Sequence, residues 1–227
     1  MGILPKIADE SIDMILCDLP YGTTQCKWDV VIPFEPLWVH YKRVIKPNGA
    51  IVLFGSEPFS SHLRLSNLKE YRYDIIWKKD NLKNFFFVKK QIGKIHENIS
   101  IFYKKQPTYV PQMQTGFHAQ STGGVGVVQT HNLNKKRRSD RHGKTDRYPT
   151  SIQEFTSLKK ALHPTQKPVP LLEFLIKTYT LEGETVLDNC MGSGSTGVAA
   201  KNLNRNFIGI EKEKKYFDMA VKRIRGY

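Results

Sequence analysis

The stretch of sequence that decides the fold is Val186-Leu187-Asp188-Asn189-Cys190-Met191-Gly192-Ser193-Gly194-Ser195-Thr196-Gly197. A short β-type run over residues 184–187 enters it, and a segment with helical periodicity over 198–203 leaves it. The glycines form the pattern G-x-G-x-x-G, which in a strand–turn–helix unit lets the backbone approach a cofactor at the helix N-terminus. A second strand, residues 206–210, ends at Glu211, about 20 residues after Gly192, the offset at which an acid holds a ribose hydroxyl.

Asp188 decides which cofactor this turn suits. It ends the strand where a dinucleotide would place its pyrophosphate, and a carboxylate there repels phosphate groups. S-Adenosylmethionine has a ribose for Glu211, no phosphate, and a cationic ammonium and sulfonium that Asp188 can pair with directly or through water. We therefore expect S-adenosylmethionine as the cofactor. The alternative is a glycine turn that only packs a strand against a helix.

The composition is that of a globular protein with a large excess of positive charge. Its 227 residues, 40% hydrophobic and 25% charged, suffice for one sizeable α/β domain or a domain with a subdomain. The net charge of +14 and the pI near 9.6 favour a polyanionic partner, DNA first. A generally basic protein without such a partner is the alternative.

Cysteine usage and hydropathy restrict the cellular setting. Cys17, Cys26 and Cys190 are odd in number and lack a C-x-x-C pair, so neither a disulfide framework nor a zinc site is expected. No apolar run approaches the ~18 residues of a membrane span, and no signal peptide opens the chain. We expect a cytoplasmic protein with no bound metal and no membrane contact.

A second loop carries the candidate chemistry. Residues 11–17 form a short apolar run typical of a buried strand, which ends in Asp18-Leu19-Pro20-Tyr21-Gly22. An aromatic amino group is a poor nucleophile because its lone pair is conjugated into the ring. The Asp18 carboxylate and the Leu19 carbonyl can accept its two N–H bonds, and Tyr21 can stack on the base. A base in duplex DNA must be flipped out to reach such a pocket.

The remaining pattern alternates helices and strands. Residues 34–46 have helical periodicity that stops at Pro47-Asn48-Gly49, and 59–68, 169–179 and 213–224 are further expected helices. Strands are expected at 50–54, 71–77 and 97–103, with a loop over 81–96. The carboxyl ends of the strands in such a sheet collect ligands, so the loops after residues 17 and 187 are expected to meet there.

Residues 104–160 lose this periodicity and carry a local charge of +8. A loop this long is usually functional or disordered, and we interpret it as a DNA-binding insertion, with a solvated basic loop as the alternative. It divides the chain into a catalytic half (1–103), the insertion (104–160) and a cofactor-binding half (161–227). The basic cluster expected to contact DNA is Lys135, Lys136, Arg137, Arg138 and Arg141.

Three motifs together resemble the β-class of DNA amino-methyltransferases. Asp18-Leu19-Pro20-Tyr21 resembles the catalytic D-P-P-Y motif, and residues 187–196 resemble the cofactor motif L-D-P-F-x-G-S-G-T-T. Residues 163–168, H-P-T-Q-K-P, match a segment that in the family precedes a helix near the cofactor methionine. The order of the motifs, with a recognition region between them, is that of the β-class, and the resemblance spans nearly the whole chain.

This resemblance implies a Rossmann-like α/β fold with a mixed sheet, helices on both faces and a target-recognition insertion. It implies methyl transfer from S-adenosylmethionine to the amino group of a flipped base. Asp18, Leu19, Pro20 and Tyr21 would be catalytic. The implied cofactor-binding residues are Asp188, Met191, Gly192, Ser193, Gly194, Thr196, Glu211, His163, Thr165, Gln166 and Lys167.

Two departures from the family pattern stand out. Leu19 replaces the first proline of the catalytic motif, but that position acts through its backbone carbonyl, so the chemistry should survive with a looser loop. The segment before residue 10 is too short for the strand and turn that family members usually carry there. One wall of the adenosine pocket is therefore expected to be missing or built differently.

The acid at position 18 favours adenine as the target, since serine is more common there in the family's cytosine enzymes. Cytosine-N4 is the alternative. Carbon-5 methylation is disfavoured, because neither Cys17 nor Cys26 follows a proline as that nucleophile does. Trp28 and Asp29 either cover the target base or plug the loop. We interpret His96-Glu97 as a strand-edge pair and leave open whether residues 85–87 insert into DNA or pack in a hairpin.

Two other classes of function compete with this interpretation. A nicotinamide oxidoreductase would use the same glycine pattern, but Asp188 opposes it and the chain lacks room for a substrate domain. A non-catalytic DNA-binding module is opposed by the intact Asp18, Pro20 and Tyr21. A restriction endonuclease is conceivable as a functional partner, and the sequence leaves monomer and homodimer both open.

Overall fold

The computed structural model describes residues 2–23, 29–82, 88–116, 145–157 and 166–226. The chain divides into two compact units, Met1–Val110 together with Ser151–Tyr227, and Pro111–Thr150. In the smaller unit an isolated antiparallel bridge joins Gln114 to Arg147. The larger unit contains the sheet, the helices and every motif of the sequence that the structure describes.

Within the described residues, seven strands form one sheet in the order β5-β3-β4-β2-β1-β6-β7. Strands β1, β2, β6 and β7 are parallel, whereas β4 runs antiparallel to its neighbours β2 and β3. The sheet is therefore mixed, as expected. The strands are β1 (Ile12–Cys17), β2 (Ile45–Gly55), β3 (Tyr71–Lys78), β4 (His96–Phe102), β5 (Ile152–Glu154), β6 (Thr185–Asp188) and β7 (Asn206–Gly209).

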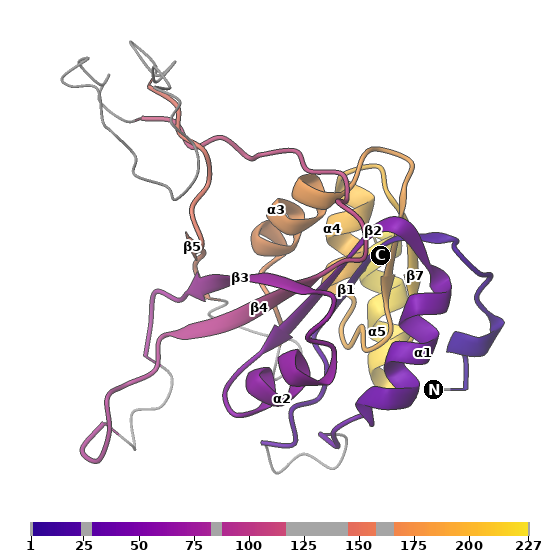
Figure 1. Ribbon diagram of the computed structural model, residues 1–227, viewed down its shortest axis with the longest axis horizontal. Helices are drawn as coiled ribbons and strands as arrows, with labels where there is room; N and C mark the ends of the chain where they lie inside the picture. The colour runs from indigo at the N-terminus through magenta and orange to yellow at the C-terminus, as the bar shows by residue number, and fades with distance from the viewer. Residues whose placement is uncertain (1, 24–28, 83–87, 117–144, 158–165, 227) are drawn as a thin grey trace. The chain divides into compact units, whose positions relative to one another are not determined.

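Helices cover both faces of the sheet (Figure 1). They are η1 (Leu4–Lys6), α1 (Phe34–Val44), α2 (Phe59–Ser66), α3 (Val169–Tyr179), α4 (Ser195–Asn202) and α5 (Lys214–Arg225). None of the helices in the described part of the chain is long and apolar enough to cross a membrane.

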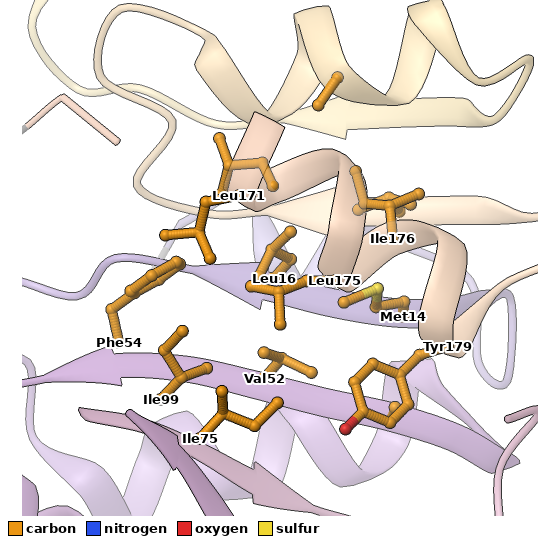
Figure 2. Packing of buried hydrophobic residues seen from close by; sticks show 14 of the residues in the cluster. Met14, Leu16, Val52, Phe54, Ile75, Ile99, Leu171, Leu175, Ile176 and Tyr179 are labelled. Atoms are coloured by element: carbon orange, nitrogen blue, oxygen red, sulfur yellow. The ribbon is translucent and has the colours of Figure 1, made fainter. Parts of the chain in front are cut away.

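The central strands are buried on both sides, which explains the apolar runs over residues 14–17 of β1 and 50–54 of β2. Met14 and Leu16 point into one core with α3 and α4, shown in Figure 2, where Leu171, Leu175 and Ile176 of α3 reach toward β1 and β2. Ile15 and Cys17 point into the other core, with residues of α1 and α2. This alternation fixes the register of β1 and hence the position of the loop that follows it.

Strand β2 differs from the prediction. The sequence Pro47-Asn48-Gly49 was expected to be a turn that ends a helix, but α1 already ends at Val44 and β2 begins at Ile45. The pairing passes from Ile12↔Ile45 to Met14↔Ala50, so the turn residues form a bulge inside the strand. The Lys46 ammonium donates a 2.6 Å hydrogen bond to the Asp13 carboxylate and so holds the bulge against β1.

Strand β5 lies within the stretch where the sequence lost its periodicity. It has three residues, pairs in parallel with the end of β3, and buries only Gln153. A strand so short, with one buried position, carries no alternating pattern that a sequence could reveal.

Strand β1 lies between β2 and β6 and is parallel to both. The chain connects β1 to β2 on one side, and reaches β6 on the other only much later. A crevice outside the carboxyl ends of the strands at such a switch point is the usual ligand site in α/β sheets. Asp18 follows β1 and Asp188 ends β6, so both acids stand at this point.

Candidate active site

A pocket of about 480 Å3 lies at the carboxyl ends of β1, β6 and β7. One part of its lining comes from the glycine-rich turn and the end of β7, and includes Asp188, Met191, Gly192, Ser193, Thr196 and Glu211. Another part comes from the loop after β1 and the segment before α3, and includes Asp18, Pro20, Gln166 and Lys167. The structure thus brings together predicted residues from three separate parts of the chain.

Asp188 is buried and holds the turn in shape. One carboxylate oxygen accepts a 2.6 Å hydrogen bond from the Thr196 hydroxyl, and the other accepts a 3.0 Å bond from the Cys190 N–H. Burial raises the pKa of Asp188 to about 6, against the lowering effect of these bonds. The Asp188 carboxyl, which lines the pocket, therefore gains or loses its charge near pH 6.

Glu211 bridges two turns. Its carboxylate accepts a 2.9 Å hydrogen bond from the Gly192 N–H and a 2.8 Å bond from the Glu213 N–H. An ionised carboxylate has about four acceptor positions, so these two bonds leave capacity for a ligand hydroxyl. The acid that the sequence placed by its offset from Gly192 does contact that glycine.

The glycine pattern serves packing as well as ligand approach. Gly194 has a left-handed backbone (φ 79°), and a Cβ there would lie 2.8 Å from the Cβ of Ala220 in α5. A Cβ on Gly197 would lie 2.4 Å from a methyl carbon of Ile224. These two glycines let α4 and α5 approach closely, and Gly194 does not line the pocket. Gly192 does line it.

The loop after β1 presents Asp18 with both carboxylate oxygens engaged. The Tyr21 hydroxyl donates to one oxygen at 2.5 Å, and the Lys167 ammonium donates to the other at 2.6 Å. The Tyr21 ring stacks on Phe59, with 4.9 Å between ring centroids. Leu19 is buried in the core on the α1 side of the sheet, which anchors the loop between the half-buried Asp18 and Pro20.

A row of alternating charges continues from Asp18. Lys167 also lies 3.3 Å from Glu97 Oε2, and Lys79 pairs with the other oxygen of Glu97. Burial tends to raise the pKa of Glu97, but the two lysines outweigh it and lower the value to about 2. Burial also raises the pKa of Asp18, opposed by Lys167. The same two carboxylates outweigh burial and raise the pKa of Lys167.

Sequence reasoning missed this row of charges. Lys167 was assigned to the cofactor side through its motif, and Glu97 was interpreted as a strand-edge residue. Glu97 lies opposite Trp77 of β3, and β4 is an interior strand between β3 and β2. Only the direction of β4 could have linked Glu97 to Asp18. Because β4 is antiparallel to β2, its first residues lie at the same end of the sheet as the last residues of β1.

Two further segments shape the pocket. Asp29 accepts hydrogen bonds from the N–H groups of Gly22 and Thr23, both at 2.9 Å, and so fixes the backbone directly after Tyr21. Residues 2–4 line the pocket, and Arg43 of α1 holds this segment through the carbonyls of Leu4 and Ile7, each at 2.8 Å. The N-terminal segment therefore forms part of the pocket lining.

Several predicted residues lie outside the described residues. They are Cys26, Trp28, residues 85–87, His163, Thr165, and the basic cluster Lys135, Lys136, Arg137, Arg138 and Arg141. Among the residues that the structure does describe, no group of three or more His, Cys, Asp or Glu side chains could hold a metal ion.

The comparison with known families decides what this arrangement of motifs represents. A profile described as DNA methylase, covering N6 and N4 methyltransferases, matches residues 12–222. The chain belongs to the DNA methylase family. This DNA methylase resembles the type II methyltransferase M2.DpnII of Streptococcus pneumoniae, at 30% identity over 97% of this chain and 85% of the relative. It is also 30% identical to M2.LlaDCHI of Lactococcus lactis subsp. cremoris, over 98% and 85% of the two chains.

Solved structures agree with this placement. The crystal structure of an M1.HpyAVI complex with S-adenosylmethionine superposes with a TM-score of 0.63 at 26% identity, covering 98% of this chain and 94% of the other. The cytosine-N4-specific PvuII DNA methyltransferase gives a TM-score of 0.63 at 14% identity over 99% and 89% of the chains, and shows the fold alone. The DNA methylase is thus an S-adenosylmethionine-dependent enzyme with the Rossmann-like fold, acting on an amino group of DNA.

The pocket suits this cofactor. The carboxylates of Asp188, Glu211 and Glu213 line one end of it, where they favour a ligand with positive charge and hydroxyl groups and oppose one with phosphates. Basic side chains in the lining are confined to Lys167 and Lys212 among the described residues, and Lys167 is already paired with Asp18.

Proposed function

We propose that this DNA methylase methylates the N6 amino group of adenine at a specific DNA sequence. The observation that carries the proposal is the single pocket that has Asp18 on one side and Asp188 with Glu211 on the other. S-Adenosylmethionine supplies the methyl group when it is bound. The residues of the chain bind, orient and hold charge around the two reactants.

Two acids bind different parts of the cofactor. Asp188 faces the cationic methionine end, where its ionised form favours positive charge, and Glu211 faces the ribose hydroxyls. Met191, Gly192, Ser193 and Thr196 form the wall between them. Gln166 and Lys167 close the pocket from the segment before α3, and His163 and Thr165 precede them in sequence.

The target side holds the amino group. The Asp18 carboxylate and the Leu19 carbonyl accept its two N–H bonds, which shifts electron density onto the nitrogen and favours attack on the methyl donor. The hydrogen bonds to a carboxylate are charge-assisted and therefore of the stronger class. Tyr21 orients the Asp18 carboxylate through its hydroxyl, and its ring is available to the flipped base once it turns from Phe59.

The acid at position 18 supports adenine over cytosine. Cytosine-N4 is the second candidate, because the same acceptor pair would bind either exocyclic amino group, and the matched family includes enzymes of both kinds. We propose further that the basic insertion between residues 104 and 160 binds DNA and reads the target sequence. A restriction endonuclease as counterpart, a monomeric or homodimeric state and a cytoplasmic location complete the proposal.

The test is methylation of plasmid DNA with radiolabelled S-adenosylmethionine, followed by nucleoside analysis that separates N6-methyldeoxyadenosine from N4-methyldeoxycytidine. We expect label in N6-methyldeoxyadenosine only. Asp18→Ala should reduce turnover about 100-fold or more, because it removes a hydrogen bond made chiefly in the transition state, while cofactor affinity falls only modestly. Label in N4-methyldeoxycytidine would decide for the second candidate, and an active Asp18→Ala variant would refute the catalytic assignment.

A further inference from the structure

We propose that Lys167 is a positioning residue with two docking points: it holds Asp18 until the target amino group arrives, and then withdraws to Glu97. The inference rests on the proposed function and concerns how the same site prepares for its substrate. It assigns a role to Glu97 that no motif of the sequence gives it.

Before the base arrives, the hydrogen bonds that Asp18 receives come from the protein itself. Tyr21 donates to Oδ1 and Lys167 donates to Oδ2. The Lys167 ammonium thus takes the place at Asp18 that the target amino group needs. It keeps the half-buried carboxylate charged and in one orientation, which spares the site reorganisation when DNA binds.

The same contact opposes the reaction once the base is in place. The amino nitrogen gains positive charge as its bond to the methyl carbon forms and the bond from that carbon to the cofactor sulfur breaks, and it becomes neutral again by losing one N–H proton to solvent. An ammonium fixed on the same carboxylate draws away its negative charge and repels this developing cation. Only interactions stronger in the transition state than before it speed the chemical step, so Lys167 serves the reaction best by leaving Asp18.

Glu97 offers Lys167 a second acceptor at short range. Its Oε2 atom is buried, accepts no well-formed hydrogen bond within the described residues, and forms an ion pair with the Lys167 ammonium at 3.3 Å. A buried acceptor that lacks a well-formed hydrogen bond is costly, so a closer approach of this ammonium is favoured. Lys79 pairs with the other oxygen and keeps the Glu97 carboxylate in place. The low pKa of Glu97, about 2, means that it stays ionised at working pH.

The surroundings allow the ammonium to move without entering water. Lys167 is 8% exposed in its side chain, and its ammonium lies 5.0 Å from the centre of the Phe54 ring. The Tyr21 ring centre is 6.0 Å away. The faces of aromatic rings attract cations, so the two rings cover the short path between the two carboxylates.

The first measurement concerns the free protein. The titration of the Asp18 carboxyl is followed by carbon-13 NMR in the wild type, in Lys167→Met and in Lys79→Met. Lys167→Met should raise the Asp18 pKa by about one unit or more, since an opposite charge in contact is lost. Lys79→Met is the matched control, because it removes a lysine from the same row that does not touch Asp18. An unchanged Asp18 pKa in Lys167→Met would overturn the first half of the proposal.

The second measurement is the single-turnover rate of methyl transfer on the DNA that the wild type modifies. Glu97→Gln keeps an acceptor but loses the charge, and Glu97→Met loses both. We expect rates that fall about tenfold for Gln and further for Met, while the affinities for cofactor and DNA stay within about twofold. Glu154→Gln is the matched control, because Glu154 pairs with Lys78 at 2.7 Å on the same sheet without contacting Lys167.

Wild-type single-turnover rates in both Glu97 variants would overturn the withdrawal of Lys167. If circular dichroism shows that Glu97→Met does not fold, the single-turnover rate of Glu97→Gln alone tests the proposal. If the wild type transfers no methyl group to DNA, the proposed function fails instead. The NMR titration then still decides whether Lys167 controls Asp18, so the two failures are distinguishable.

Discussion

The Tyr41 hydroxyl donates a 2.5 Å hydrogen bond to Asn189 Oδ1, across 148 positions of sequence. Tyr41 belongs to α1 and is fully buried, and Asn189 follows β6 in the pocket wall. The helix that connects β1 to β2 is therefore tied to the turn that faces the cofactor. The turn after β6 thus has a support that lies outside both motifs.

Replacing Tyr41 by Phe should loosen this support. The change keeps the ring and its packing but leaves the Asn189 oxygen without its donor, which costs about 1 kcal/mol of unfolding free energy. We expect cofactor affinity to fall as well, because Asn189 lines the pocket. Urea unfolding and calorimetric titration with S-adenosylmethionine measure the two effects. Tyr148→Phe, at an exposed tyrosine outside the pocket lining, serves as the comparison, and equal behaviour of the two variants would contradict the prediction.

Cofactor affinity should depend on pH through Asp188. Burial raises its pKa to about 6, so the carboxylate is mostly protonated at pH 5 and mostly ionised at pH 7. The cationic end of the cofactor prefers the ionised form, so affinity should rise as pH increases through about 6. The effect on stability has the opposite sign. Because the pKa of Asp188 is higher in the folded than in the unfolded state, this group stabilises the fold most at pH values below its unfolded pKa. The contribution is lost as pH rises through its folded pKa.

Titrations with S-adenosylmethionine between pH 5 and pH 7.5 would measure this dependence. Asp188→Asn is the control, since it keeps one acceptor and cannot ionise, and its affinity should be lower at pH 7 and nearly flat with pH. A wild-type affinity that does not change over this range would show that Asp188 does not face the positive end of the ligand.

The packing role of Gly194 is testable against a matched glycine. Gly194→Ala forces a Cβ into the left-handed backbone and against Ala220, whereas Gly183 has the same φ of 79° with nothing within 4 Å. Gly183→Ala should cost about 1 kcal/mol, from backbone strain alone. Gly194→Ala should cost about 2–4 kcal/mol, because overpacking adds to the strain. Thermal unfolding of both variants checks the difference, and equal losses would mean that α5 moves aside freely.

The basic cluster should set the salt dependence of DNA binding. Changing Lys135, Lys136, Arg137 and Arg138 together to alanine should weaken binding, because fewer counterions are released. The slope of log affinity against log salt should become shallower by about 0.9 for each lost phosphate contact. Cofactor affinity, measured in parallel, should hold. An unchanged slope would move the search for DNA contacts to the basic residues between 83 and 94.

The local part of this architecture could be predicted from sequence, and the distant part could not. The run before Asp18 is apolar at every buried position of β1 except Asp13, and the glycine pattern marks the turn after β6, so both loops were predicted with their order. The bulge at Pro47-Asn48-Gly49 was not predicted, because the same residues are typical of a turn. The contact between Lys167 and Asp18 joins residues 149 positions apart and depends on which strands lie side by side.

The N-terminal wall of the pocket opens a route to altering the enzyme's choice of donor. Arg43 holds this segment by its backbone carbonyls, and such bonds do not depend on the side chains at positions 2 and 3. A Cβ on Gly2 would meet nothing within 4 Å, and Ile3 is exposed. The acids across the pocket also hold turns together, so changes there damage folding and binding at once. Reshaping the pocket for donors with an altered adenosine group should therefore begin at residues 2 and 3.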